Sequence, residues 1–180
     1  MKKYELTSET KVINGVKLHQ IKALNSFGNI KEGDLGGWIE SEKNLSQYGD
    51  AWVCGNAIVC DNAIVRGNAY VGGNSCVGGN SCVCENAIVC DNVIVSENAT
   101  VRGNATIRRK EDYIVFKNWW SSGRCFTWTR SNNKWNVGCF YGSGEELIAK
   151  AYKDSAKSGR EYERVVKYVE SILKEENNNK

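Results

Sequence analysis

The sequence predicts a mainly β protein that is built around a β-solenoid of short stacked coils. A six-residue pattern repeats ten times in tandem from Asp50 to Arg109, without an insertion. The chain has 18 glycines but no proline, so its turns depend on Gly, Asn and Asp. Beyond Arg109 the residues have the spacing of strands followed by helices. We therefore expect a cap at 1–49, a solenoid at 50–109 and an α+β module at 110–180.

Each six-residue unit is predicted to form one short strand and one corner. Counting from Asp50, position 1 is Asn in nine units, position 2 is Ala or Ser with one Val, and position 4 is Val in nine units and Ile107 in the last. Positions 2 and 4 lie on the same side of an extended strand, so both face the core. Positions 6 and 1 form Gly-Asn, Asp-Asn or Glu-Asn pairs, which tolerate the left-handed backbone of a sharp corner.

Three units would close a triangular coil of 18 residues, and stacked coils would lie about 4.8 Å apart, the usual strand spacing. The position 1 side chains should then form three ladders along the corners, with hydrogen bonds between their amides. The ladders are Asn56, Asn74 and Asn92; Asn62, Asn80 and Asn98; and Asp50, Asn68, Asn86 and Asn104.

These columns resemble those of the hexapeptide-repeat family. The stretch Val53-Cys54-Gly55-Asn56-Ala57-Ile58 fits the aliphatic and small positions of that family. The residue after the aliphatic one departs from the family pattern in most units, where it is Cys, Arg or Ser, and only Gly72 and Gly78 match. The resemblance implies a left-handed parallel β-helix and a homotrimer.

The segments YELTSET, IKAL and GDLGGWIES also resemble the N-terminal region of hexapeptide-repeat proteins from bacteria and bacteriophages. Many of those proteins are labelled transferases by analogy with the coil alone. This second resemblance implies that the chain is encoded by a phage or a prophage.

Position 3 of each unit points away from the coil interior but is often apolar. Contiguous apolar patches mark contacts, so these side chains are predicted to face the C-terminal module or another protomer. The predicted interface residues are Trp52, Tyr70, Ile88, Ile58, Ile94 and Ile64.

The predicted cap contains a β-hairpin and the start of the solenoid. Asn14-Gly15 lies between two apolar stretches, which is the usual signal of a two-residue hairpin turn. Ile39 and Leu45 are expected in register with Ala51, so a degenerate first coil should begin near residue 38. Atypical end repeats of this kind cover the open edge of a solenoid.

The C-terminal module is predicted to have the order βββαα. Strands are expected at 113–116, 124–129 and 134–141, with turns at Ser121-Ser122-Gly123 and Ser131-Asn132-Asn133. Ser143-x-x-Glu146 and Ser158-x-x-Glu161 are two capping boxes, each of which predicts the start of a helix. The second helix carries an apolar stripe that should cover the sheet; it comprises Tyr162, Val165, Val166, Val169, Ile172 and Leu173.

The same module holds the candidate binding residues. Aromatic and cationic side chains together can bind bases, nucleotides or a protein hot spot. The alternative is that alternate aromatic residues form the core beneath the helices, although one of Trp119 and Trp120 should be exposed or at an interface. The candidates are Trp119, Trp120, Arg124, Trp128, Arg130, Lys134 and Trp135.

Composition excludes several classes of protein. The net charge of +3 does not predict nucleic-acid binding. The N-terminus lacks the apolar region of a signal peptide and no apolar run is long enough for a membrane span, so a soluble, cytoplasmic protein is expected. Six of the eight cysteines occupy equivalent repeat positions, which favours packing or surface thiols over disulfides or a metal site.

Three functions are compatible with these features. An acyltransferase of the hexapeptide-repeat family would take its acyl group from a coenzyme A donor and use a histidine as general base, but His19, the one histidine, lies in the cap. A polymer-forming structural protein is disfavoured by the cap and the added module. We favour a non-enzymatic oligomeric binding protein without cofactor or metal, whose partner is a host protein or a small nucleotide ligand; inhibiting or sequestering a host-defence component would suit it.

Overall fold

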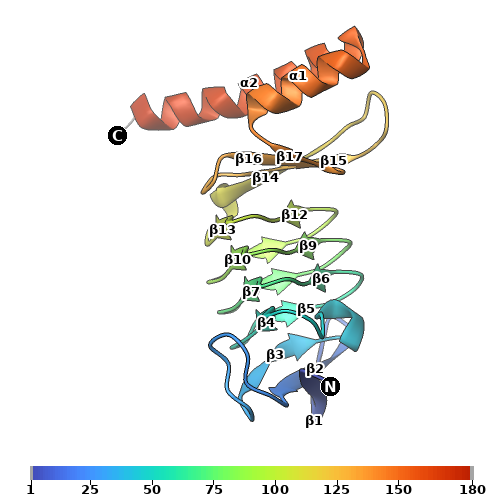
Figure 1. Cartoon of the computed structure of the whole chain (residues 1–180), viewed down its shortest axis with the longest axis vertical. Coiled ribbons are helices and arrows are strands. Elements are labelled where there is room, and N and C mark those ends of the chain that lie inside the picture. Colours follow the sequence, from blue (N-terminus) through green and yellow to red (C-terminus); the bar gives the residue numbers. More distant parts are fainter. Residues whose placement is uncertain (1, 179–180) are drawn as a thin grey trace. The chain divides into compact units, whose positions relative to one another are not determined.

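The computed structural model describes residues 2–178, whose contacts divide into two compact units (Figure 1). The first unit comprises residues 2–113 together with Thr129–Asn132. The second comprises Ile114–Trp128 and residues 133–178.

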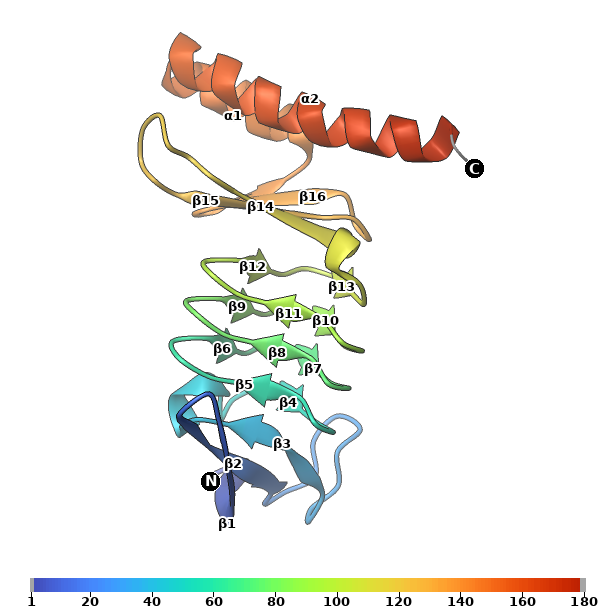
Figure 2. The same cartoon turned by 180° about the vertical axis from the view of Figure 1, so that it is seen from behind.

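The first unit contains a β-solenoid of about four turns, in which parallel strands of successive coils stack on one another (Figure 2). Strands one coil apart pair in register 18 residues apart, as Ile88 does with Tyr70 and with Thr106. The sequence prediction of a β-solenoid is therefore confirmed. The coil strands are β4 (Trp52–Val53), β5 (Ile58–Val59), β6 (Ile64–Val65), β7 (Tyr70–Val71), β8 (Cys76–Val77), β9 (Cys82–Val83), β10 (Ile88–Val89), β11 (Ile94–Val95), β12 (Thr100–Val101) and β13 (Thr106–Ile107).

The repeat columns take the places that their chemistry predicts. The Val and Ile side chains of position 4 are fully buried, and the small residues of position 2 are buried beside them. The corner residue at position 6 has a positive φ in every unit up to Gly103, including Asp61, Glu85, Asp91 and Glu97. Because this left-handed region strains residues that carry a Cβ, Gly occupies the other corners.

The predicted asparagine ladders are present along all three corners. Asn56 donates to Asn74 at 3.1 Å, Asn62 donates to Asn80 at 3.1 Å, and Asn68 donates to Asn86 at 3.1 Å. At the start of the third ladder the backbone N–H of Asp50 donates to the Asn68 side chain at 3.4 Å. These side-chain hydrogen bonds connect each coil to the next, in addition to the backbone hydrogen bonds between the coils.

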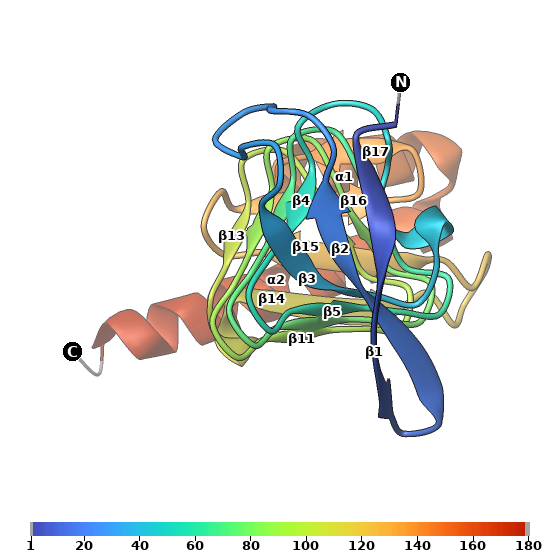
Figure 3. The ribbon, with the colours of Figure 1, turned by 90° about the horizontal axis from the view of Figure 1, so that it is seen from below.

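The N-terminal cap is a three-stranded antiparallel extension of one coil sheet. It contains β1 (Tyr4–Ile13), β2 (Val16–Ala23) and β3 (Leu35–Ile39), and β3 pairs in parallel with β5. Asn14 and Gly15 both have positive φ at the turn between β1 and β2, which confirms the predicted hairpin. Figure 3 shows the coils superimposed, with the tip of this hairpin projecting beyond their outline.

The first coil exists, but its predicted register is wrong. Ile39 pairs with Val59 and Leu45 bridges to Val65, so both occupy the position 4 column and not the narrow position 2 column of Ala51. Their spacing from these partners is 20 residues, whereas Trp52 and Tyr70 are 18 apart. Nine of the ten position 2 residues are Ala or Ser, so the larger Ile and Leu side chains suit the position 4 column better, and the segment after Leu45 absorbs the two extra residues. A short 3-10 turn, η1 (Glu42–Asn44), precedes Leu45.

Trp52 lies beneath the cap, although its position in the repeat points outward. Only 2% of its surface is exposed, and its ring meets the edges of Tyr4 and Phe27 at centroid distances of 6.4 and 5.4 Å. The Tyr4 hydroxyl donates to the Leu45 carbonyl at 2.7 Å. The apolar surface of Trp52 is therefore buried within its own unit.

Four strands form the antiparallel C-terminal sheet, where three were expected. In order across the sheet they are β14 (Tyr113–Lys117), β15 (Cys125–Thr129), β16 (Lys134–Val137) and β17 (Phe140–Gly142). The segment predicted as one strand at 134–141 is a hairpin because Gly138 turns with φ +57°. A 3-10 turn, η2 (Lys110–Asp112), leads into β14.

Two helices follow this sheet, α1 (Gly144–Asp154) and α2 (Ala156–Asn178). The Ser143 capping box is confirmed, since its hydroxyl accepts from the Glu146 N–H at 3.2 Å and the Glu146 carboxylate accepts from Ser143 at 2.7 Å. The Ser158 box is wrong. Ser158 lies within α2, and its N–H donates to the Ser155 hydroxyl at 3.0 Å, because the helix begins three residues earlier than predicted.

The second unit has its own core between the sheet and the helices. Its buried side chains are Phe126, Trp128, Trp135, Val137, Leu147, Val166 and Val169. The predicted stripe of α2 supplies the last two, and Tyr162, Val165 and Leu173 pack against them. Within residues 2–178, neither helix has the length and apolar character of a membrane span.

Candidate functional site

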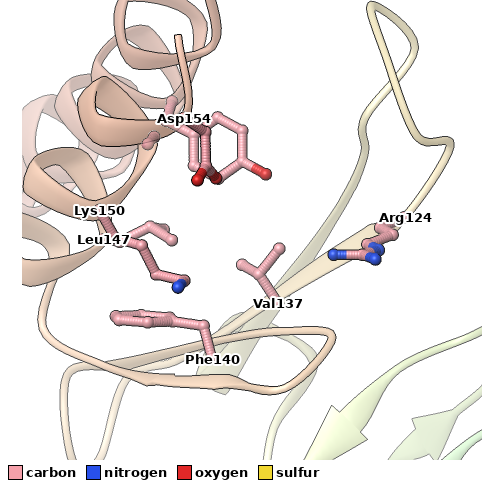
Figure 4. Close-up of a pocket in the computed structure, with 8 residues that line it drawn as sticks. Arg124, Val137, Phe140, Leu147, Lys150 and Asp154 are labelled. Atoms are coloured by element: carbon pink, nitrogen blue, oxygen red, sulfur yellow. The ribbon is translucent and has the colours of Figure 1, made fainter.

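The candidate site is a pocket in the second unit, between the sheet and the two helices (Figure 4). It encloses about 300 Å³, counting the space that opens to solvent. Its lining combines an apolar wall with three charged residues. The lining residues are Arg124, Val137, Phe140, Leu147, Lys150, Ala151, Asp154 and Tyr162.

The two cations reach the pocket from different elements. Arg124 follows the turn at Ser121–Gly123, and its side chain lies over Gly138, where an added Cβ would be 3.5 Å from the Arg124 Cδ and Nη1 atoms. Lys150 extends from α1 and lines the same pocket (Figure 4). Neither side chain forms a hydrogen bond or an ion pair with any other residue in 2–178. Both charges are therefore available to a ligand.

Asp154 supplies the negative charge of the lining, at the C-terminal end of α1. Lys150 and Asp154 are four residues apart on one helix, so they occupy the same face. No salt bridge between them is present in the described part of the chain. The carboxylate can thus accept a hydrogen bond from a ligand.

An aromatic cluster stands behind the pocket. The Tyr162 ring meets Phe126 at a centroid distance of 4.6 Å and Trp120 at 5.8 Å. Burial raises the pKa of Tyr162, while Asn118 and the Arg124 guanidinium oppose the rise. The phenol is therefore neutral at physiological pH and able to donate a hydrogen bond.

The prediction that one of the two adjacent tryptophans is exposed is confirmed. Trp119 is 80% exposed, and its ring meets that of Trp120 edge to face at 6.0 Å. Both residues lie in a turn and not in a strand. The indole N–H of Trp120 is buried and has no hydrogen-bond partner within residues 2–178, which is uncommon for a buried donor.

The structure places the other predicted binding residues elsewhere. Trp128 and Trp135 are buried in the core, and the Trp128 Nε1 donates to the Asn133 side chain at 2.9 Å. Arg130 belongs to the first unit, where its Nε donates to the Glu111 carbonyl at 3.0 Å. Lys134 lies on β16, and its charge acts on Glu146. Of the predicted set, Arg124 alone lines the pocket.

Sequence reasoning missed Lys150, Asp154 and Tyr162. Lys150 and Asp154 have the spacing of charges on a solvated helix face, which is the commoner setting for such a pair. Tyr162 was assigned to the apolar stripe, where its ring does pack. A signal was present in the four-residue spacing of the two charges, but the fold is needed to place Arg124 opposite them.

The predicted interface residues differ in exposure. Ile64, Tyr70 and Ile94 are exposed at 43%, 39% and 64%, while Ile58 and Ile88 are half-buried. The Tyr70 hydroxyl lies 2.5 Å from the Cys54 sulfur. Apart from Trp52, these outward side chains therefore leave apolar surface along the coil.

His19 lies in the cap, on β2, where its backbone pairs with Thr10 and Ile39. The side chain is half-buried, and its imidazole forms no hydrogen bond with another residue in the described range. Among residues 2–178, no three His, Cys, Asp or Glu side chains gather as a metal site would require.

No protein-family model matches this sequence, and no curated protein is significantly similar to it. The candidate function therefore depends on the geometry of the site itself.

Proposed function

We propose that the chain is a non-enzymatic, oligomeric binding protein whose second unit binds a small anionic ligand of the nucleotide type. The observation that carries this proposal is the pair of cations, Arg124 and Lys150, that form no salt bridge within residues 2–178 and line one pocket with an apolar and aromatic wall. Guanidinium and ammonium groups are the usual protein ligands of phosphate.

The rest of the lining suits the other parts of such a ligand. A base or another flat ring can lie against Phe140 and Leu147, which are half-buried and buried. Asp154 can accept from a hydroxyl or an amino group, and the Tyr162 phenol can donate. The pocket is small and open, so part of the ligand would remain outside it.

The solenoid would serve as the oligomeric scaffold. We propose a left-handed coil and a trimer in a phage or prophage protein, on the basis of the repeat columns; the exposed Ile64, Tyr70 and Ile94 support self-association. A protein of this kind would sequester a nucleotide signal or inhibit a host-defence protein. A nucleotide is the ligand that the pocket chemistry favours.

The test is isothermal titration calorimetry of the full chain against a panel of nucleoside mono- and triphosphates and cyclic dinucleotides. Arg124→Gln and Lys150→Gln should each weaken binding of the best ligand at least about tenfold, since a hydrogen bond to a charged group contributes about 1.5–3 kcal/mol. Arg160→Gln and Lys174→Gln, which replace exposed cations of α2 outside the pocket, are the matched controls.

Native mass spectrometry of protein purified gently from cells complements this titration. A trimer with added mass of nucleotide size supports the proposal, and added mass of coenzyme A would favour a transferase instead. If no nucleotide in the panel binds, or if the control variants weaken binding as much as the pocket variants, the proposal is wrong.

A further inference from the structure

A cluster of thiols and arginines lies on one side of the solenoid, in the first unit and separate from the pocket described above. Arg66, Cys84 and Arg102 occupy equivalent positions in three successive coils, and the strands that carry them pair in register. The Arg66 N–H donates to the Val83 carbonyl at 3.0 Å, and the Cys84 N–H donates to Val101 at 3.0 Å. The backbone ladder therefore fixes Cys84 between two arginines.

Cys82 lies next to this column, between Ile64 and Thr100 of the adjacent coils. Cys82 and Cys84 are two residues apart on one strand edge, so both side chains point outward. Their thiols interact with each other, and the Arg66 guanidinium interacts with both sulfurs. Cys82 is half-buried, whereas Cys84 is 6% exposed, so an incoming reagent meets Cys82 first.

The two arginines differ in their interactions with carboxylates. Arg102 donates to the Glu85 carboxylate through both Nε, at 3.0 Å, and Nη2, and Glu85 also accepts from the Gly103 N–H at 2.8 Å. Much of the Arg102 charge is thus compensated by Glu85. Arg66 forms no salt bridge within residues 2–178, although its charge also acts on Glu85, so its guanidinium can act on the thiols and on an anion that approaches.

We propose that Cys82 is a reactive thiolate that forms a mixed disulfide with an anionic low-molecular-weight disulfide, with Arg66 binding a carboxylate of that reagent. Beside the pair is an open pocket of about 500 Å³, counting the space that opens to solvent, and it is lined by Arg66, Gly67, Cys84 and Glu85. It gives room for the part of the reagent that carries the carboxylate. This site is independent of the nucleotide site proposed for the second unit.

The electrostatics of the cluster support this assignment. A hydrogen bond from the Cys84 thiol and the charge of the Arg66 guanidinium together lower the pKa of Cys82 to about 6, against the effect of burial. The same hydrogen bond raises the pKa of Cys84, and Glu85 adds to that rise. The pair therefore loses one proton easily and retains the other.

The reaction is a thiol–disulfide exchange. The Cys82 thiolate attacks one sulfur of the reagent, a Cys82–sulfur bond forms, and the S–S bond of the reagent breaks. The departing thiolate carries the electron pair and takes a proton from water. Cys82 is oxidised to the mixed disulfide, and one half of the reagent is reduced to a thiol.

The test is treatment of the full chain with glutathione disulfide at pH 6, followed by peptide mass mapping over time. Cys76 is the matched comparison, because it has the same outward position on the neighbouring side of the coil, and burial raises its pKa. At pH 6 about half of the molecules carry a thiolate if the thiol has a pKa near 6. The thiolate fraction is only about a thousandth for a thiol with the ordinary cysteine pKa. Lower nucleophilicity offsets part of this gain, so Cys82 should react roughly ten- to thirtyfold faster.

Variants test the role of Arg66. Arg66→Gln should raise the pKa of the Cys82 thiol, because the guanidinium no longer stabilises the thiolate. The modification of Cys82 should then be about two- to sixfold slower at pH 6. Arg108→Gln, at the same repeat position on another side of the coil, should leave the rate unchanged. Cystamine, a cationic disulfide, should be affected less by Arg66→Gln than glutathione disulfide is.

Equal rates at Cys82 and Cys76 at pH 6 would overturn the proposal, as would an unchanged rate in Arg66→Gln. The pH dependence gives a second readout, set by the charged and titratable groups around Cys82, namely Cys84, Arg66, Arg102 and Glu85. The Cys82 rate should level off above about pH 7. If the rate of Cys82 modification kept rising to pH 9, the Cys82 thiol would have an ordinary pKa.

Discussion

Asn74 donates a side-chain hydrogen bond to Asn92 at 3.0 Å, although the two residues are 18 positions apart in the chain. Asn74 also accepts from Asn56 at 3.1 Å, so it occupies the centre of its ladder. Each of these amides is exposed at a corner, where water competes for it. The ladder is nevertheless continuous, which suggests that aligned amides reinforce one another.

Replacing the central member of this ladder should destabilise the solenoid. Asn74→Ala removes two hydrogen bonds, and we expect a loss of about 1–2 kcal/mol in the free energy of unfolding. Asn98→Ala, at the end of another ladder, removes only the bond from Asn80 at 3.2 Å and should lose about half as much. Urea denaturation followed by far-ultraviolet circular dichroism measures both. Equal losses would show that the ladder bonds do not determine stability.

The corner formed by Gly79 and Glu97 should respond in opposite directions to two substitutions. Glu97 has φ +64°, a strained value for a residue with a Cβ, so Glu97→Gly should stabilise the chain by about 0.5–1 kcal/mol. Gly79→Ala should destabilise it by about 1–3 kcal/mol, because the new Cβ would lie 2.8 Å from the Glu97 carbonyl oxygen. Thermal unfolding of the two variants checks the signs. If Gly79→Ala stabilised the chain, the corner would have room for the added Cβ and the predicted clash with Glu97 would be wrong.

The solenoid could be predicted closely because one pattern is repeated ten times and every column has one physical role. The core face, the positive φ at position 6 and the asparagine ladders all follow from spacing and residue type. The first coil could not be placed, because Ile39 and Leu45 are too far from the repeat pattern to set a register. Their partners, Val59 and Val65, are known only from the pairing of β3 and the bridge beyond it.

The candidate site was less predictable. A sheet with alternate aromatic residues suits either a core or a binding surface, and sequence spacing does not separate the two. Trp128 and Trp135 proved to be core, whereas Arg124 lines the pocket. Lys150 and Asp154 come from a helix whose position over the sheet depends on tertiary packing. The thiol cluster likewise depends on coil register, which brings Arg66 beside Cys82.

Lys3 should make stability depend on pH in the alkaline range. Its ammonium donates to the carbonyls of Gly49 at 3.2 Å and Ala51 at 2.8 Å, and burial lowers its pKa to about 8, opposed by Asp50. The unfolded chain holds the proton up to about pH 10.4, so between these values the unfolded state binds more protons than the folded state. The free energy of unfolding should therefore rise with pH in this window.

Urea denaturation at pH 7.5 and 9.5 measures this dependence for the native chain and for Lys3→Met. From pH 7.5 to pH 9.5 the free energy of unfolding of the native chain should increase by about 1–3 kcal/mol more than that of Lys3→Met. Working below pH 10 avoids the titration of Tyr4, whose pKa burial raises and whose effect on stability has the opposite sign. Lys2→Met is the control, because Lys2 is exposed and paired with Glu42 at 2.7 Å. A difference that does not change with pH would show that Lys3 titrates normally.

Asp154 should weaken the binding of phosphate-bearing ligands, since its carboxylate shares the pocket with Arg124 and Lys150. Asp154→Asn keeps the shape and a hydrogen-bond acceptor but removes the charge. We expect the affinity for a nucleoside triphosphate to rise about two- to fivefold in 50 mM salt, as a like charge near a protein surface contributes about 1 kcal/mol.

Calorimetry at two salt concentrations tests the electrostatic origin of this gain, which should shrink in 300 mM salt because screening shortens the range of exposed charges. Glu175→Gln, at an exposed site of α2 outside the pocket, is the matched control and should leave the affinity unchanged. Weaker binding by Asp154→Asn would mean that hydrogen bonds from the ligand to the carboxylate outweigh its repulsion of the phosphates, since an amide is a poorer acceptor than a carboxylate. In that case the base or sugar, and not the phosphate, lies beside α1.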